Sequence, residues 1–321
     1  LQVEHPVTEL ITGLDLVALQ LRVAQGAALG FQQRDVALNG HAIEVRLYAE
    51  DPARDFLPRT GPVLAWVPPQ GEGVRVDAGI ASGGQVSPFY DSMVAKIVAH
   101  GATRDEARRR LIGALQDTAL FGFTSNRDFL IDALGREDFV AGRATTALID
   151  ATYGAQGYEP GPIESEVWAV AAVIQHRLGC GQAHDAALGV SAELLDWSSD
   201  VGFGSVREYA VDGEDPCGVH VQPCGVGAYE VNVAGASVRI LVKSESPQCM
   251  NLAVNDDAFQ VRFFAEGERA LHLSVGSRCY LATDLSAGAA AEDEAAGSGL
   301  ITAPMHGLLL SVAVVEGDTV N

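Results

Sequence analysis

The pattern of expected helices and strands changes about halfway along this 321-residue chain. From about Leu194 to Leu285 the sequence contains only short strand-like runs separated by turns. Regularly spaced short strands without helices are typical of a small β-barrel or sandwich. The part up to about Asp150 instead mixes helical and strand periodicity, and one isolated helical stretch, IESEVWAVAAVIQHRLG, lies between the two parts. We therefore expect a multidomain α+β chain.

Three helices of the first part have recognisable N-terminal signals. Asp15, Thr103 and Ser125 each precede a helical stretch, and each is a residue type that accepts a hydrogen bond from the first helical turn. Glu106, three residues after Thr103, predicts a capping box. The helix after Asp15 carries three apolar residues at helical spacing that we expect to face the core: Leu16, Leu19 and Val23.

The opening sequence LQVEHP alternates apolar and polar residues. This alternation predicts a strand over residues 1–5 that ends at Pro6, because proline cannot donate a hydrogen bond to a neighbouring strand. Gln2 and Glu4 would share one face of that strand, and Arg46 lies on a second strand, GHAIEVRLYAED. A carboxylate can act as a general base, and an arginine can hold a small planar anion with two hydrogen bonds. The residues alone leave two interpretations open: a shared site, or ordinary half-exposed strands with a cross-strand ion pair at Arg46.

Charge and cysteine content argue against several classes of protein. The formal net charge is −21, and the acidic residues are dispersed, whereas nucleic acids and anionic membranes require a basic surface on their partner. No run of about 18 apolar residues is present, so no transmembrane helix is expected. The five cysteines are odd in number and none forms a CxxC pair, which disfavours a zinc site or a disulfide framework. Reduced thiols favour a cytoplasmic location.

Three blocks of sequence resemble the biotin carboxylase family. They are LQVEHPVTELITGLDLVALQLRVAQG, GHAIEVRLYAEDP with the following FLPRTG, and SPFYDSMVAKIVAHG. The C-terminal APMHGLLLSVAVVEGDTV resembles the first half of a biotinyl carrier domain, with His306 where that family usually has proline. The helix and barrel between them resemble the subunit-bridging domain of acyl-CoA carboxylase alpha subunits. Within that group the sequence as a whole, rather than any one motif, is most similar to the subunits that act on methylcrotonyl-CoA or geranyl-CoA.

This resemblance implies an order of domains. We expect the C-terminal end of an ATP-grasp domain (1–30), a biotin carboxylase C-terminal domain (31–150), a linker (151–163), a helix plus β-barrel bridging domain (164–285), a second linker (286–299) and the start of an all-β biotinyl domain (300–321). The resemblance also implies that the chain is a C-terminal fragment that begins within an active-site motif. Such a fragment is expected to be inactive by itself.

The resemblance further implies roles for individual residues. Glu4 would deprotonate bicarbonate, which then attacks the terminal phosphate of ATP and forms carboxyphosphate. Gln2, the backbone N–H of Val3 and the side chain of Arg46 would bind bicarbonate, and Arg46 would also stabilise the charge of carboxyphosphate. Four residues are expected to lie around this site: His5, Glu44, Tyr90 and Asp91.

The implied cofactors are biotin, ATP and Mg²⁺. The residues that bind ATP and Mg²⁺ in this family would lie mostly upstream of Leu1, and no metal ligand is expected in this chain. The biotin-accepting lysine of the family stands in an Ala-Met-Lys-Met turn, and neither Lys96 nor Lys243 has that context. The implied partners are a carboxyltransferase beta subunit, the biotinyl domain of the same chain and further subunits of an oligomer, with no nucleic acid or membrane partner.

Two alternatives remain within these expectations. The chain could belong to an acetyl-CoA, pyruvate or urea carboxylase, since the acyl-CoA substrate cannot be read from the sequence. It could also act as a non-catalytic docking module whose barrel recruits another carboxylase subunit.

Overall fold

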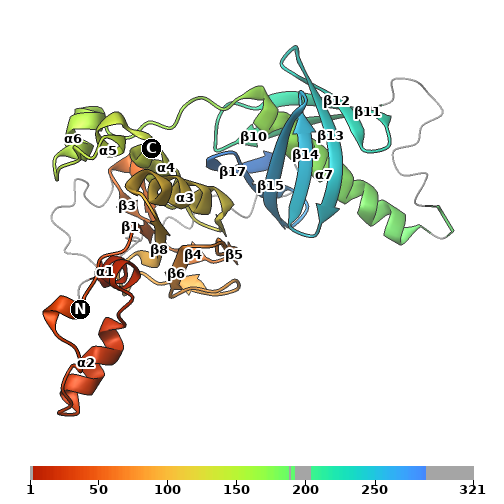
Figure 1. Ribbon diagram of the computed structural model, residues 1–321. Coiled ribbons are helices and arrows are strands. Elements are labelled where there is room, and N and C mark those ends of the chain that lie inside the picture. The colour runs from red at the N-terminus through yellow and green to blue at the C-terminus, as the bar shows by residue number, and fades with distance from the viewer. Residues whose placement is uncertain (1–2, 188, 192–203, 287–321) are drawn as a thin grey trace, which may run out of the picture.

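The computed structural model describes residues 3–187, 189–191 and 204–286. Figure 1 shows two folding units, an N-terminal unit of helices and small sheets and a C-terminal barrel. Gln2, which was predicted to be a site residue, lies outside the described residues, as do the expected biotinyl segment 300–321 and all of the second linker except Ser286. Within the described ranges no helix is long and apolar enough to cross a membrane.

The N-terminal unit contains six helices within the described ranges. They are α1 (His5–Thr12), α2 (Leu16–Ala24), α3 (Arg104–Asp117), α4 (Arg127–Gly135), α5 (Glu137–Val140) and α6 (Leu148–Tyr153). Short 3-10 turns lie at η1 (Gln33–Asp35), η2 (Pro52–Arg54) and η3 (Gly154–Gln156). Helix α6 crosses the expected boundary between residues 150 and 151, so part of the predicted linker is helical.

The sheet that matters most for the site has the strand order β1-β8-β6. Its strands are β1 (His41–Tyr48), β6 (Val74–Ala78) and β8 (Met93–Gly101), and both pairings are antiparallel. Because side chains alternate across a strand, one face of this sheet is apolar and packs against α3. The core there contains Val45, Leu47, Ile97, Leu111 and Leu115.

Three two-stranded sheets complete the N-terminal unit. They pair β2 (Glu50–Asp51) with β3 (Leu57–Pro58), β4 (Gly61–Pro62) with β7 (Gln85–Val86), and β5 (Ala65–Val67) with β9 (Ala119–Phe121).

Residues 205–284 form a closed barrel of eight antiparallel strands in sequence order. The strands are β10 (Ser205–Val211), β11 (Cys217–Gly225), β12 (Ala228–Val233), β13 (Ala236–Ser246), β14 (Cys249–Val254), β15 (Asp257–Glu266), β16 (Ala270–Val275) and β17 (Arg278–Asp284). Asn255 and Asp256 both have positive φ, 48° and 79°, as a tight hairpin turn requires. The expectation of a barrel or sandwich is thus resolved in favour of a barrel.

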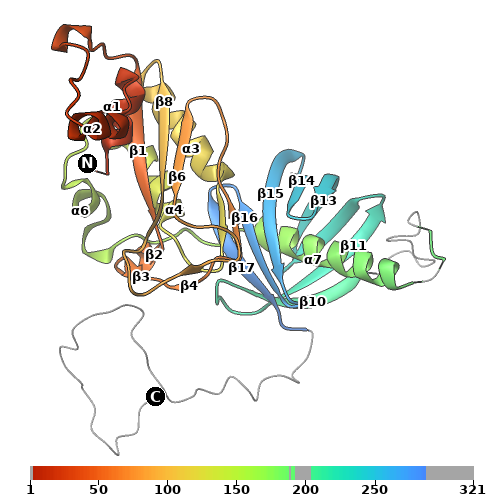
Figure 2. The same cartoon turned by 90° about the horizontal axis from the view of Figure 1, so that it is seen from below.

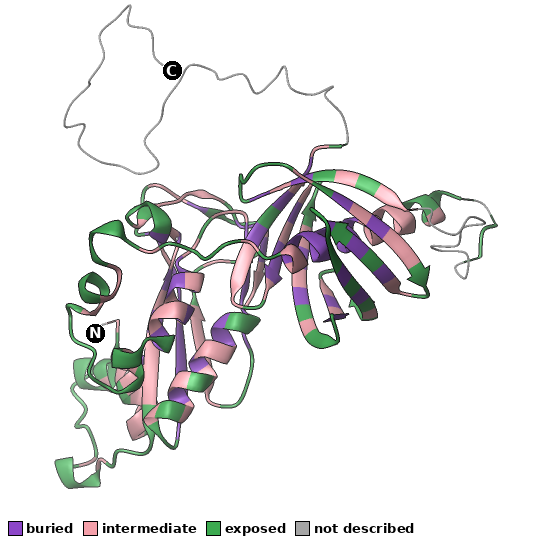
Figure 3. Ribbon diagram, turned by 90° about the horizontal axis from the view of Figure 1, so that it is seen from above, coloured by how far each residue is buried: buried purple, intermediate pink, exposed green. Residues whose placement is uncertain are grey.

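Helix α7 (Ser165–Ala186) runs into this barrel, as Figure 2 shows. Nine consecutive residues, Val167–Gln175, are buried, so this half of the helix is covered on every side. A helix that is apolar all round must be surrounded by protein. Figure 3 shows the result, with buried residues on the helix and on alternate positions of the surrounding strands.

Three local predictions are wrong. Residues 1–5 do not form a described strand, because α1 begins at His5 with Pro6 in its first turn, where proline's missing N–H costs nothing. Val23 on α2 is 51% exposed, and α2 has no buried residue, because it projects away from the sheet (Figure 1). The N-cap of α4 is Asn126 and not Ser125.

Candidate functional site

The polar face of the sheet β1-β8-β6 carries the predicted site. Glu44, Arg46 and Tyr48 point to this face, since they alternate with the core residues of β1. The registers Arg46↔Lys96 and Asp77↔Lys96 place two further charged side chains on the same face. Charged residues of three strands therefore gather on one surface.

Helix α1 lies against this polar face and supplies the opposing carboxylates. Arg46 Nη2 donates a hydrogen bond to Glu4 Oε1 at the start of the helix. One turn further on, Arg75 Nη1 donates to Glu9 Oε2 at 2.6 Å. The helix is thus attached to the sheet by two arginine–carboxylate pairs.

The structure brings Glu4 and Arg46 together, although Glu4 does not lie on a strand. Glu4 is the N-cap of α1, and the first turn of this helix lies beside β1. The side chains of Arg46 and Glu4 are 37% and 58% exposed, so a small solute can reach both groups. The pair can therefore offer an anion one carboxylate and one guanidinium from the same open surface.

The charge of Arg46 is reinforced by its surroundings. A hydrogen bond to Tyr48 is the largest cause that raises the pKa of Arg46. Burial, the second-largest cause, lowers it, and the charges of Tyr48, Glu4 and Glu44 raise it, so that the net pKa lies above its ordinary value. Arg46 therefore stays a cation and a fixed hydrogen-bond donor at any physiological pH.

Glu44 differs from the other carboxylates of this face. Its Oε2 is buried and has no hydrogen-bond partner among the described residues. Burial is the main cause that raises its pKa, although the charges of Lys96 and Arg46 lower it and that of Glu4 raises it. Glu44 is thus the carboxyl group of this surface that is least stable as an anion.

The pair Arg75–Glu9 belongs to a second, more tightly bonded group. Arg75 also binds Asp77 through Nε and Nη2, both at 3.0 Å, and Lys96 Nζ lies 3.4 Å from Asp77. The Glu9 side chain is only 9% exposed and accepts a further bond from Leu16 N–H at 2.8 Å. These bonds fix α1 in place and engage both carboxylate oxygens of Glu9.

The remaining predicted residues lie around the pair. Val3 is half-buried just before α1, and His5 is the first residue of that helix and also half-buried. Tyr90 is 79% exposed in the loop before β8, and Asp91 accepts a hydrogen bond from Met93 N–H at 2.7 Å. Within the described residues Tyr90 and Asp91 have no hydrogen bond or ion pair with Arg46, so their roles stay predictions.

Asn126 is a residue of this region that the sequence did not reveal. It is 5% exposed, and its side chain bonds to the backbone of Arg46 and Tyr48 at the end of β1. In the sequence Asn126 ends the segment TSN, which precedes a helix. An asparagine at that position can cap the helix or bond to a neighbouring strand, so the sequence does not distinguish the two roles.

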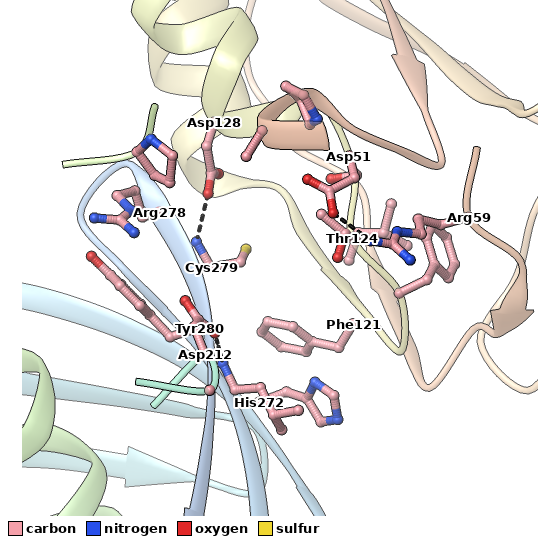
Figure 4. A pocket seen from close by; sticks show the side chains of 18 of the residues that line it. Asp51, Arg59, Phe121, Thr124, Asp128, Asp212, His272, Arg278, Cys279 and Tyr280 are labelled. Carbon is pink, nitrogen blue, oxygen red and sulfur yellow. Dashed lines mark hydrogen bonds and ion pairs between the residues drawn. The ribbon is translucent and has the colours of Figure 1, made fainter. Parts of the chain in front are cut away.

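A cavity of about 850 Å³ lies between the two folding units and is shown in Figure 4. Its arginines already have partners: Arg59 binds Asp51 at 2.5 Å, and Arg278 donates to the carbonyl of Gly161. Arg59 is thus paired with a carboxylate, whereas the hydrogen bonds of Arg278 go to uncharged backbone carbonyls. Among the described residues, no group of His, Cys, Asp and Glu has the arrangement of a metal site.

Comparisons with known proteins concern mainly the first half of the chain. Residues 44–151 match the family described as the biotin carboxylase C-terminal domain. Residues 1–32 match the family described as the ATP binding domain of the carbamoyl-phosphate synthase L chain.

Curated relatives are similar over the same region. Biotin carboxylase 2 of Bacillus subtilis (strain 168) is 50% identical over 149 residues, 46% of this chain and 33% of the relative. The mitochondrial methylcrotonoyl-CoA carboxylase subunit alpha of Rattus norvegicus is 43% identical over 150 residues, 46% of this chain and 21% of the relative. The mitochondrial propionyl-CoA carboxylase alpha chain of Caenorhabditis elegans is 42% identical over 171 residues, 52% of this chain and 24% of the relative. The chain therefore spans a third or less of the length of these relatives.

A solved structure, the biotin carboxylase domain of a thermophilic 2-oxoglutarate carboxylase bound to bicarbonate, is 36% identical with a TM-score of 0.48. The match covers 50% of this chain and 36% of that chain.

Proposed function

Residues 44–151 match the biotin carboxylase C-terminal domain, and on this premise we propose that the chain belongs to the biotin carboxylase family and is part of the biotin carboxylase component of an acyl-CoA carboxylase. The complete enzyme would be an ATP-dependent ligase that uses bicarbonate to carboxylate biotin. The observation that carries this proposal is the open pair of Glu4 and Arg46 on the polar face of the sheet.

In this proposal Glu4 is the general base. Bicarbonate would bind beside the Glu4–Arg46 pair, held by Arg46, Gln2 and the backbone N–H of Val3. Glu4 would take the proton of bicarbonate, and the resulting anion would attack the terminal phosphate of ATP to give carboxyphosphate and ADP. Arg46 would hold the negative charge during this step, because a fixed cation in a partly desolvated site stabilises charge without reorganising.

Biotin, when bound, supplies the ureido nitrogen that accepts the carboxyl group. In this proposal the lysine that carries biotin lies outside residues 3–286. The residues that make the main contacts with ATP and Mg²⁺ also lie outside this range. We place the enzyme in the cytoplasm, because all five cysteines are free thiols.

For the second half of the chain we propose a docking role towards a carboxyltransferase beta subunit. A closed barrel with a central helix is rigid and leaves its loops and outer surface for a partner. We favour methylcrotonyl-CoA or geranyl-CoA as the substrate of the complete enzyme. The alternatives are that the enzyme is an acetyl-CoA, pyruvate or urea carboxylase. A biotinyl carrier domain and further subunits complete the proposed assembly.

The test uses the full-length protein that carries this chain. ADP release is measured with and without bicarbonate and free biotin. ADP release that requires bicarbonate, together with carboxylation of biotin, supports the proposal. A full-length protein that binds its beta subunit but releases no ADP in response to bicarbonate would support the docking role alone.

A further inference from the structure

The end of β1 that carries Arg46 lies at an edge of the sheet. In the order β1-β8-β6, only one side of β1 is bonded to another strand. The register with β8 also shifts between Leu47 and Tyr48, so the ladder is irregular just beyond Arg46. An edge strand with an irregular end needs other partners for its N–H and C=O groups if it is to hold one position.

Asn126 supplies these partners. Its Nδ2 donates to Arg46 C=O at 3.1 Å, and its Oδ1 accepts from Tyr48 N–H at 2.9 Å. Its own backbone N–H donates to Tyr48 C=O at 3.1 Å. A carboxamide combines a donor and an acceptor in one plane, so this side chain bonds the strand edge much as a neighbouring strand would.

We propose that Asn126 is a positioning residue for Arg46, which fixes the backbone from which the guanidinium reaches Glu4 and bicarbonate. This inference rests on the proposed function. Asn126 does not touch Glu4 or the proposed bicarbonate position. It acts through the strand, and it leaves its own helix uncapped to do so, because its side chain makes no capping hydrogen bond.

The next two residues attach Asn126 to the barrel. Arg127 is 1% exposed and bonds to both folding units. Its partners are the carbonyls of Leu115, Gln116 and Ser277, the hydroxyl of Ser274 and the thiol of Cys279. Asp128 Oδ2 accepts from Cys279 N–H at 3.1 Å, the bond drawn in Figure 4. Asn126 is therefore held between β1 and the barrel strands β16 and β17. Contact between the barrel and the N-terminal unit thus contributes to the position of Arg46.

The experiment compares Asn126→Asp and Asn126→Ala in the full-length enzyme. Aspartate keeps the size of the side chain and the acceptor for Tyr48 N–H but loses the donor to Arg46 C=O. We expect the KM for bicarbonate to rise about tenfold or more in both variants, because each loses the donor to Arg46 C=O, the scale of one lost hydrogen bond. The KM for ATP should change less than twofold. The matched control is Asn232→Asp, a remote barrel asparagine whose Oδ1 accepts from Gly235 N–H.

A second measurement separates positioning from general destabilisation. Hydrogen exchange of the Tyr48 amide in this chain should be slow in the wild type and in Asn126→Asp, and fast in Asn126→Ala. An unchanged bicarbonate KM in folded Asn126→Asp and Asn126→Ala would overturn the inference while leaving the proposed function intact. Failure of both variants to fold would assign Asn126 to overall stability and would also overturn it. A wild-type enzyme without bicarbonate-dependent ADP release would instead refute the proposed function, and the Tyr48 exchange would still report on the contact.

Discussion

Arg46 on β1 donates a hydrogen bond to Glu4 at the N-terminal end of α1, across 42 residues of sequence. The two groups are held by different elements, and neither lies on a free loop. A carboxylate at a helix N-terminus is favoured by the helix dipole, and here a guanidinium adds to that effect. Glu4 is therefore held against a guanidinium while its side chain stays open to solvent.

Glu4→Gln in the full-length enzyme tests its proposed role as a base. Glutamine keeps the size of the side chain but cannot take a proton, so biotin carboxylation should fall by about 10²–10⁴-fold. The apparent affinity for ATP should be unchanged. The control is Glu214→Gln, an exposed position in the barrel. If Glu4→Gln retains more than about a third of the wild-type turnover, the assignment is wrong, because a positioned base contributes far more.

Arg46→Lys tests the need for a planar, two-pronged donor. Lysine keeps the charge but loses the fork that binds a carboxylate-like anion with two bonds. We expect the KM for bicarbonate to rise by about tenfold or more, with a further loss of turnover in Arg46→Ala. Steady-state kinetics with varied bicarbonate give both values. Unchanged bicarbonate dependence in both variants would remove Arg46 from the site.

Alternation and turn residues were sufficient to predict some of the structure. The alternation places Glu44 and Arg46 on the polar face of β1 because the neighbouring residues are apolar, and regularly spaced short strands predict a barrel or a sandwich, of which the structure forms the barrel. The contact of Arg46 with Glu4 did not follow from spacing. It was expected from the family resemblance, whereas the alternation of LQVEH predicted a strand over residues 1–5, and the described residues of that segment, 3–5, form a turn and the start of α1.

The role of Asn126 and the enclosure of α7 depend on tertiary contacts, which no local sequence pattern encodes. Asn126 resembles a helix cap in the sequence, and only the position of β1 beside α4 reveals its bonds to Arg46 and Tyr48. Similarly, the apolar run in α7 predicted a helix, but a helix enclosed by a barrel requires knowledge of how the strands close.

Glu44→Gln should stabilise the chain at neutral pH. Burial raises the pKa of Glu44 above its ordinary value of 4.5, so folding favours the protonated form. Its contribution to stability is therefore present below pH 4.5 and is lost as the pH rises through the raised pKa. Glutamine is neutral at every pH, so the melting temperature should exceed that of the wild type at pH 7.5, and the difference should shrink near pH 4. Equal melting temperatures at pH 7.5 would contradict this prediction.

Glu9 should give the opposite dependence on pH. Burial raises its pKa, but hydrogen bonds from Arg75 and Leu16 N–H, with the charges of Arg75 and His5, lower it more, and the net pKa lies below 4.5. The stability that Glu9 contributes is present above pH 4.5 and is lost as the pH falls through the lowered pKa. Glu9→Gln should therefore reduce the melting temperature at pH 7 and make it less sensitive to acid. Glu137→Gln, whose side chain is 91% exposed, is the control and should follow the wild-type curve.

Arg127→Met tests the attachment of the barrel to the N-terminal unit. The change removes a fully buried cation that bonds to Asp128 and to groups on both units, so it leaves several buried acceptors without a donor. We expect it to lower the free energy of unfolding by about 3–5 kcal/mol, the usual cost of breaking a buried ion pair. Arg109→Met, in an exposed pair with Asp105, should lower the free energy of unfolding far less, because water screens this pair. Denaturant unfolding measures both. Because Arg127 follows Asn126, the full-length Arg127→Met enzyme should also have a higher KM for bicarbonate. Equal stability of the two variants would show that Arg127 does not hold the two units together.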